Sequence, residues 1–168
     1  MSTRQKIIMC ILAMFICSGL LAQQQKPVVA IVPFDIISGA VTDAEADMIT
    51  DVFSLHLGNT KKVNIVDRRM QDIIMKEPKF QSDDWSDNDK IAKLGEALKA
   101  DLIVHGRIEK FGNKIMIMVG IYNIHTFMLE GAERLMLANA EEVYDKIDLL
   151  VDSSIKIITG ATESKKEK

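Results

Sequence analysis

The stretch Val28-Val29-Ala30-Ile31-Val32-Pro33-Phe34 determines the fold class that this sequence predicts. It is a continuous apolar run, with one proline before it at position 27 and a second proline near its end. An apolar run bounded by such breakers is typical of a strand that is buried on both faces of a sheet. A sheet buried on both faces requires helices on both sides, so we predict an α/β fold.

Signals for helices and strands alternate downstream of this strand. Thr42 followed by Glu45 is a capping box, which predicts a helix that ends at Gly58-Asn59. Three later helices are predicted to start after the N-cap residues Asp67, Ser86 and Asn139. Further strands are predicted at residues 63–66, 101–110, 114–124 and 129–135, the last three as an antiparallel meander. The predicted fold is a single three-layer α/β domain, with a mixed β-sheet flanked by helices in the order βαβα-α-βββ-α.

The residues before Pro27 have the layout of a secretory signal peptide. Basic residues at positions 4 and 6 precede an apolar run at 7–16, and small residues lead to a cleavage site after Ala22. An uncleaved anchor is a less favoured alternative, because the run is shorter than the about 20 residues that cross a bilayer. Lipidation of Cys17 is a second alternative, although Ile16 stands where a small residue is expected.

Composition then limits the class of protein. We predict a signal peptide at residues 1–22, a folded domain at 27–158 and a polar tail at 159–168. Removal of the leader leaves 146 residues, a common size for one domain with a full core. Both cysteines lie in the leader, so the exported domain is expected to contain no disulfide and no thiolate ligand. The formal net charge of −3 disfavours nucleic acid as a partner, because that binding depends on basic side chains.

No pattern in the sequence predicts catalysis or a metal site. The three histidines, His56, His105 and His125, have no acidic or thiol residue spaced to complete a zinc site. An acidic cluster within residues 83–89 lacks the glycine and the final glutamate of a calcium loop. The sequence also lacks a nucleophile elbow and a phosphate-binding glycine loop. We therefore predict no catalytic residue, no metal ligand and no cofactor.

Two features predict a binding surface, and each has a structural alternative. Alternation along the strand at 114–124 places Met116, Met118 and Tyr122 on one face. These side chains belong to the core if helices cover both faces of the sheet. Otherwise the methionines offer an adaptable surface to a partner or to a second copy of the chain. The single tryptophan, Trp85, lies in the polar segment 77–89, where it either anchors a partner or folds back onto the core.

Four sequence blocks resemble a family of bacterial envelope proteins. In chain order they are Val29-Ala30-Ile31-Val32-Pro33-Phe34, Val63-Asn64-Ile65-Val66-Asp67-Arg68, Leu94-Gly95-Glu96-Ala97-Leu98-Lys99-Ala100-Asp101 and Leu102-Ile103-Val104-His105-Gly106-Arg107-Ile108. They resemble the family of the curli-secretion channel lipoprotein (CsgG-type). The same domain type occurs in outer-membrane activators of penicillin-binding proteins (LpoB-type) and, more distantly, at the N-terminus of TolB. The resemblance extends over residues 27–158.

The chain departs from this family in three respects. No pair of long alternating strands is left over for the membrane-spanning hairpins of the curli channel. Ile16 weakens the lipidation site that the channel and the activator share. Phe127 and Met128 follow Thr126 where the family often has a Thr-Gly turn. The chain therefore resembles the bare domain without the pore.

The resemblance implies a non-catalytic domain that binds another protein. The favoured hypothesis is an accessory or activator of an envelope enzyme such as a peptidoglycan synthase, with a penicillin-binding protein as partner. Its expected location is the periplasm or the periplasmic face of the outer membrane, with membrane contact only if Cys17 is lipidated. The alternative is a structural component of a curli-type secretion assembly that forms homo-oligomers, and a small-molecule sensor is a third. The predicted binding residues are Trp85, Met116, Met118 and Tyr122.

Overall fold

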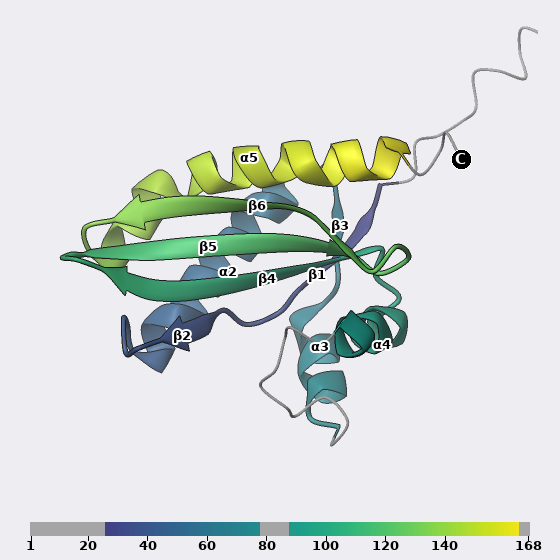
Figure 1. Ribbon diagram of the computed structural model, residues 1–168, viewed down its shortest axis with the longest axis horizontal. Helices are drawn as coiled ribbons and strands as arrows, with labels where there is room; N and C mark the ends of the chain where they lie inside the picture. The colour runs from purple at the N-terminus through teal and green to yellow at the C-terminus, as the bar shows by residue number, and fades with distance from the viewer. Residues whose placement is uncertain (1–25, 78–87, 165–168) are drawn as a thin grey trace, which may run out of the picture.

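A mixed sheet runs through the computed structural model, which describes residues 26–77 and 88–164 (Figure 1). The strands are β1 (Val28–Ile31), β2 (Asp35–Ile37), β3 (Asn64–Ile65), β4 (Leu102–Phe111), β5 (Lys114–Asn123) and β6 (Met128–Leu137). The helices are α2 (Asp43–Asn59), α3 (Arg68–Met75), α4 (Asn88–Leu98), the 3-10 helix η2 (Ala140–Glu142) and α5 (Val143–Ser164). This order of elements confirms the predicted α/β fold class.

The first strand, β1, lies inside the sheet. The strand order is β3-β1-β4-β5-β6, and β2 also pairs with β4. β1 is parallel to both of its neighbours, whereas β4, β5 and β6 form the predicted antiparallel meander. Val29 and Ala30 are both fully buried, and they pack into separate core clusters on opposite faces of β1. The prediction of a strand buried on both faces is confirmed.

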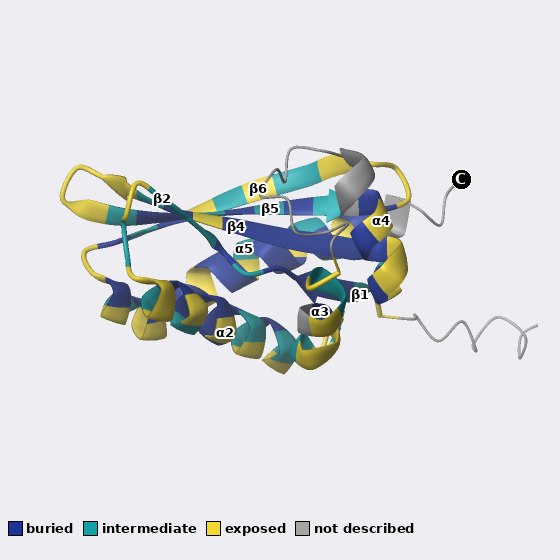
Figure 2. Ribbon diagram, turned by 90° about the horizontal axis from the view of Figure 1, so that it is seen from below, coloured by how far each residue is buried: buried dark blue, intermediate teal, exposed yellow. Residues whose placement is uncertain are grey.

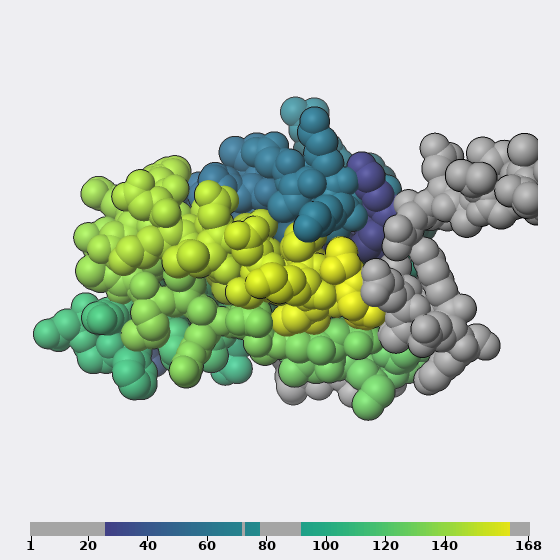
Figure 3. Space-filling model, turned by 90° about the horizontal axis from the view of Figure 1, so that it is seen from above, coloured from purple at the N-terminus to yellow at the C-terminus, as the bar shows by residue number. Residues whose placement is uncertain are grey.

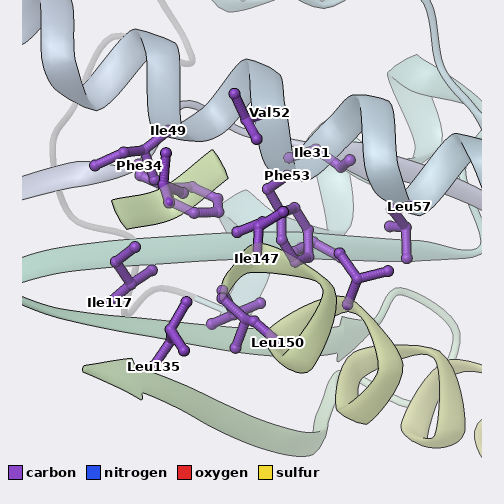
Figure 4. Packing of buried hydrophobic residues seen from close by; sticks show 14 of the residues in the cluster. Ile31, Phe34, Ile49, Val52, Phe53, Leu57, Ile117, Leu135, Ile147 and Leu150 are labelled. Atoms are coloured by element: carbon purple, nitrogen blue, oxygen red, sulfur yellow. The ribbon is translucent and has the colours of Figure 1, made fainter. Parts of the chain in front are cut away.

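Helices α2 and α5 cover one face of the sheet and lie side by side (Figures 2 and 3). The capping box starts α2 as predicted, because Thr42 Oγ1 accepts from Glu45 N at 3.3 Å and Glu45 Oε2 accepts from Thr42 N at 2.7 Å. Between these helices and the sheet lies the larger core cluster (Figure 4). In it the rings of Phe34 and Phe53 pack with centroids 5.6 Å apart. Thr50 joins the layers, since its hydroxyl accepts from Phe34 N and donates to the Ala46 carbonyl.

Helices α3 and α4 cover only part of the second face. The smaller core cluster joins Leu94 and Leu98 of α4 to Ile103 at the start of β4 and to Ile124 just after β5. Figure 2 shows α4 beside the sheet on the side opposite to α2 and α5. Along the rest of this face, toward the β4–β5 turn, no described helix packs against the strands. The expectation of helices on both sides therefore holds for one end of the sheet.

The inner side of α3 differs from its sequence pattern. The 3.6-residue spacing predicts Met70, Ile73 and Ile74 on the inner side. Ile74 packs against the smaller core cluster as predicted, whereas Met70 and Ile73 are 53% and 62% exposed and Gln71 is 2% exposed. A polar side chain takes the buried position because Gln71 Nε2 donates to the Val66 carbonyl at 2.8 Å, which satisfies its amide.

Three further differences concern β2, the start of η2 and the end of α5. β2 was not predicted, because three residues are too few to show a periodic pattern, and it pairs in parallel with β4. Asn139 Oδ1 accepts from Glu142 N as predicted, but Glu142 Oε2 accepts from Ala138 N, so the expected second half of the capping box is shifted by one residue. α5 continues to Ser164 and thus includes the first residues of the predicted polar tail.

Candidate interaction surface

Three methionines line the part of the second face that no described helix covers. Cross-strand pairing sets Met116 of β5 beside Met136 of β6. The same pairing sets Met118 of β5 between Arg107 of β4 and Arg134 of β6. These five residues are referred to below as the methionine face. They share one side of the sheet because side chains that are paired across neighbouring strands point to the same side.

The methionine face combines apolar and cationic groups, and two acidic residues border it on the same side: Glu109 of β4, which pairs with Met116, and Asp35 of β2, which pairs with Arg107. Met116 is buried at 9% exposure, Met118 and Met136 are half-buried, and Arg107 and Arg134 are exposed. Within residues 26–77 and 88–164, neither arginine takes part in an ion pair. Methionine and arginine are both enriched at protein interfaces, and the flexible thioether adapts to partners of different shape. The arrangement can therefore bind a surface that offers apolar and acidic groups.

A histidine–aspartate pair borders this surface. His105 lies on the same side of β4 as Arg107 and is 7% exposed. Its Nε2 lies 2.9 Å from Asp35 Oδ2 on β2. The contact joins β2 to β4 and holds the imidazole in place. A buried polar group with a partner of this kind is a structural element of the sheet.

Tyr122 lies two strand positions beyond Gly120 and is half-buried against the smaller core cluster. A Cβ at Gly120 would lie 3.0 Å from Tyr122 Cε2 and 3.3 Å from its hydroxyl oxygen, so the ring folds back along β5 over Gly120. The structure thus brings Met116 and Met118 together and places Tyr122 between the methionine face and the core. Trp85 and Cys17, the other two predicted residues, lie outside the described residues.

Sequence reasoning did not single out Arg107, Arg134 or Met136. Their contribution depends on cross-strand register, which pairs residues from three strands and is not visible in one strand alone. Alternation within residues 128–137 could have suggested that Arg134 and Met136 share a face. The neighbouring side chains in β4 and β5 could not have been assigned without the register.

Each histidine pairs with a different aspartate. His56 Nδ1 lies 2.6 Å from Asp148 Oδ1 and links α2 to α5, and His125 Nε2 lies 3.3 Å from Asp101 Oδ1. His105 and His125 are therefore held by separate partners. In the described part of the chain, no three histidine, cysteine or acidic side chains are grouped to hold a metal ion. That the protein has no metal site and no catalytic activity stays a prediction.

A pocket of about 220 Å³ opens at the carboxyl ends of β1 and β3. Such crevices are common ligand sites in α/β sheets when neighbouring crossovers leave to opposite sides. Here Arg68 forms ion pairs with Asp47 and Asp51, and Gln71 donates to the Val66 carbonyl. The main polar groups of the pocket are thus engaged within the domain, and we assign no ligand to it.

The helices within residues 26–77 and 88–164 do not have the combination of length and apolar composition that a membrane span requires. No protein-family model matches the chain, nor does any curated protein sequence. Similarity is found among solved structures. The LpoB C-terminal domain from Escherichia coli superposes with a TM-score of 0.56 at 13% identity, over 74% of this chain and 93% of that domain.

Two further structures share the fold. TolB from Acinetobacter baumannii superposes with a TM-score of 0.51 at 15% identity, over 82% of this chain but 29% of TolB. Lipoprotein GNA1162 from Neisseria meningitidis superposes with a TM-score of 0.50 at 8% identity, over 80% of this chain and 99% of that protein. At these identities the likeness concerns the fold alone. The chain has an LpoB-like fold.

Proposed function

We propose that this protein is a non-catalytic binding domain of the cell envelope that docks onto a peptidoglycan synthase of the penicillin-binding protein class. The observation that carries the proposal is the row Arg107–Met118–Arg134, in which two exposed arginines flank a half-buried methionine on the part of the sheet face that no described helix covers. The LpoB-like fold supports it, because the four sequence blocks resemble a family whose domain type also occurs in activators of penicillin-binding proteins. The fold covers nearly the whole of the LpoB C-terminal domain.

The expected location follows from the leader and from the same likeness. The signal-peptide layout of residues 1–22 supports export, and GNA1162 is a lipoprotein by its name. A domain in the periplasm, or at the periplasmic face of the outer membrane, meets the periplasmic parts of peptidoglycan synthases. Processing of the leader after Ala22 and lipidation of Cys17 are both compatible with this role.

The partner surface is expected to carry acidic groups around an apolar contact. Interface hot spots are enriched in arginine, and truncation of one such residue costs about 1–4 kcal/mol of binding. Arg107→Ala combined with Arg134→Ala should therefore weaken binding at least about tenfold. Trp85→Ala tests the predicted second anchor in the same assay.

Binding is measured by interferometry between the exported protein and detergent-solubilised penicillin-binding proteins of the same bacterium. The control is Arg69→Ala, which removes an exposed arginine from α3, away from the methionine face. Thermal unfolding of each variant shows whether the fold is intact. A double arginine variant that binds as tightly as Arg69→Ala would remove the methionine face from the partner site.

The alternative is a structural component of a curli-type secretion assembly. It predicts that the chain forms large homo-oligomers through its sheet and helix faces. Sedimentation velocity at high protein concentration separates the two proposals. A monomer supports the accessory role, whereas a discrete ring-sized species would favour the secretion assembly.

A further inference from the structure

The turn between β5 and β6, together with the first two residues of β6, exposes three consecutive large apolar side chains. Phe127, Met128 and Leu129 are 52%, 65% and 51% exposed. Turns of this kind usually carry glycine, asparagine, aspartate or serine. Phe127 also has a φ of 58°, in the left-handed region that disfavours a bulky residue. The exposed apolar side chains and the strained backbone would both destabilise an isolated domain. They indicate that this turn contacts something outside the domain.

This turn lies next to the point where the described chain begins. Asp101 connects the two, because its Oδ2 accepts from Val28 N at 2.9 Å and its Oδ1 lies 3.3 Å from His125 Nε2. The Asp101 carbonyl also accepts from Ile124 N. Figure 1 shows the β5–β6 turn, the start of β1 and the C-terminal end of α5 at the same end of the sheet. The apolar leader in the sequence therefore joins the domain beside an exposed apolar turn.

Four exposed lysines surround the same end. Lys26 precedes β1, Lys61 and Lys62 precede β3, and Lys99 precedes β4. They lie together because β1, β3 and β4 are parallel, so their starting ends share one edge of the sheet. None of the four forms an ion pair among the described residues. Two carboxylates at this end of the sheet, Asp101 and Glu130, hold hydrogen bonds within the domain, and Glu96 lies in the last turn of α4.

Two of these lysines occupy positions where glycine is the common residue. Lys61 has a φ of 56° after α2, and Lys99 has a φ of 51° after α4. A left-handed residue just after a helix is usually glycine, because a side chain is strained there. With Phe127 they make three of the four non-glycine residues of positive φ in the described chain. Strained backbone thus presents both the cationic and the apolar groups of this end.

We propose that this end of the domain, formed by Phe127–Leu129, Lys26, Lys61, Lys62 and Lys99, docks onto an anionic lipid bilayer. Apolar side chains enter the boundary between headgroups and acyl chains, and lysines at the same level contact anionic headgroups. The lipid surface also fits the leader, because a retained leader would connect to the domain at this end, just before Lys26.

The test uses the full chain bound to vesicles of phosphatidylcholine, with or without phosphatidylglycerol. Cys10 and Cys17 are replaced by Ala, and an environment-sensitive fluorophore is attached at Met128→Cys. The matched position is Asn113→Cys, exposed in the β4–β5 turn at the opposite end of the sheet. We expect a blue shift at position 128 that requires phosphatidylglycerol, and none at 113. Equal shifts at both positions, or none at 128, would overturn the proposal and leave a protein as the occupant.

Two variants separate docking from folding. Lys61→Gln, Lys62→Gln and Lys99→Gln together should lower the binding constant for anionic vesicles more than tenfold, because each lysine near such a surface contributes about fivefold to that constant. Phe127→Gly should weaken docking and leave the melting temperature unchanged or higher, since glycine relieves the strained φ. Weaker folding in Phe127→Gly with docking intact would show that Phe127 serves the fold.

Discussion

Replacement of Gly106 by alanine should destabilise the domain, because the added methyl group would overpack the larger core cluster. Gly106 is buried on β4, and a Cβ there would lie 2.3 Å from both Cγ and Cδ1 of Phe34. Carbon atoms pack best at about 3.5–4.0 Å, so one group must move by more than about 1 Å. Phe34 has little room to move, because it is 4% exposed, its ring packs on Phe53 and its N–H donates to Thr50.

The expected cost is that of overpacking a dense core, about 1–3 kcal/mol. For a domain of this size that corresponds to a fall in melting temperature of about 3–12 °C, which circular dichroism at 222 nm measures. Phe34→Leu provides the second half of a double-mutant cycle, because it removes the ring that the added methyl group would contact. In that background Gly106→Ala should cost markedly less. An equal cost in both backgrounds, or a change below about 1 °C in the wild-type background, would refute the argument.

Three further substitutions should change stability in directions that the structure sets. Gly160→Ala in α5 should raise stability by up to about 1 kcal/mol, because no atom lies within 4 Å of the added Cβ and alanine is the better helix former. Ser154→Ala should also raise it, by about 1 kcal/mol, because Ser154 Oγ is buried with no hydrogen-bond partner among the described residues; a fall would show that the hydroxyl has a partner. Thr42→Ala should lower stability by about 1 kcal/mol at pH 7 through loss of the N-cap. Hydrogen bonds from the Thr42 backbone N–H, and then from its hydroxyl, hold the pKa of Glu45 below its usual value of 4.5. A lowered pKa of Glu45 in the folded state stabilises that state at pH values above the pKa of the unfolded chain. This stabilisation is lost as the pH falls through the folded-state pKa. The difference in the free energy of unfolding between Thr42→Ala and wild type should therefore narrow in urea melts at pH 3.

The sheet could be predicted from sequence because its strands carry strong local signals. The apolar run at 28–34 and the meander from 101 to 135 both reappear, and the Thr42–Glu45 capping box starts α2 as expected. β2 was missed since its three residues have no pattern of their own and depend on pairing with β4. On α3 the prediction was right for Ile74 and wrong for Met70 and Ile73, because a local hydrogen bond to the Val66 carbonyl allows Gln71 to be buried.

The candidate surfaces were less accessible to sequence reasoning. Alternation in β5 identified Met116 and Met118, but whether they lie in a core depends on where α3 and α4 pack. The arginines beside Met118 come from two other strands, whose register a single sequence does not reveal. Lys26, Lys61, Lys62 and Lys99 are far apart in the sequence. They lie at one end of the sheet only because the parallel strands β1, β3 and β4 all begin there.

The methionine face and the proposed lipid-docking end lie at different positions along β5. Substitutions should therefore be able to weaken one interaction without the other. Met118 is five residues before the end of β5 at Asn123, which corresponds to about 17 Å of strand. A domain docked by its Phe127 turn would hold the methionine face above the headgroups, facing sideways toward a partner. Replacement of Lys61, Lys62 and Lys99 by Gln should therefore weaken lipid docking more than tenfold while partner affinity in detergent solution stays unchanged. Arg107→Ala with Arg134→Ala should show the reverse. If either set of changes weakened both interactions equally, lipid and partner would share one surface, and the division of the domain into two sites would be wrong.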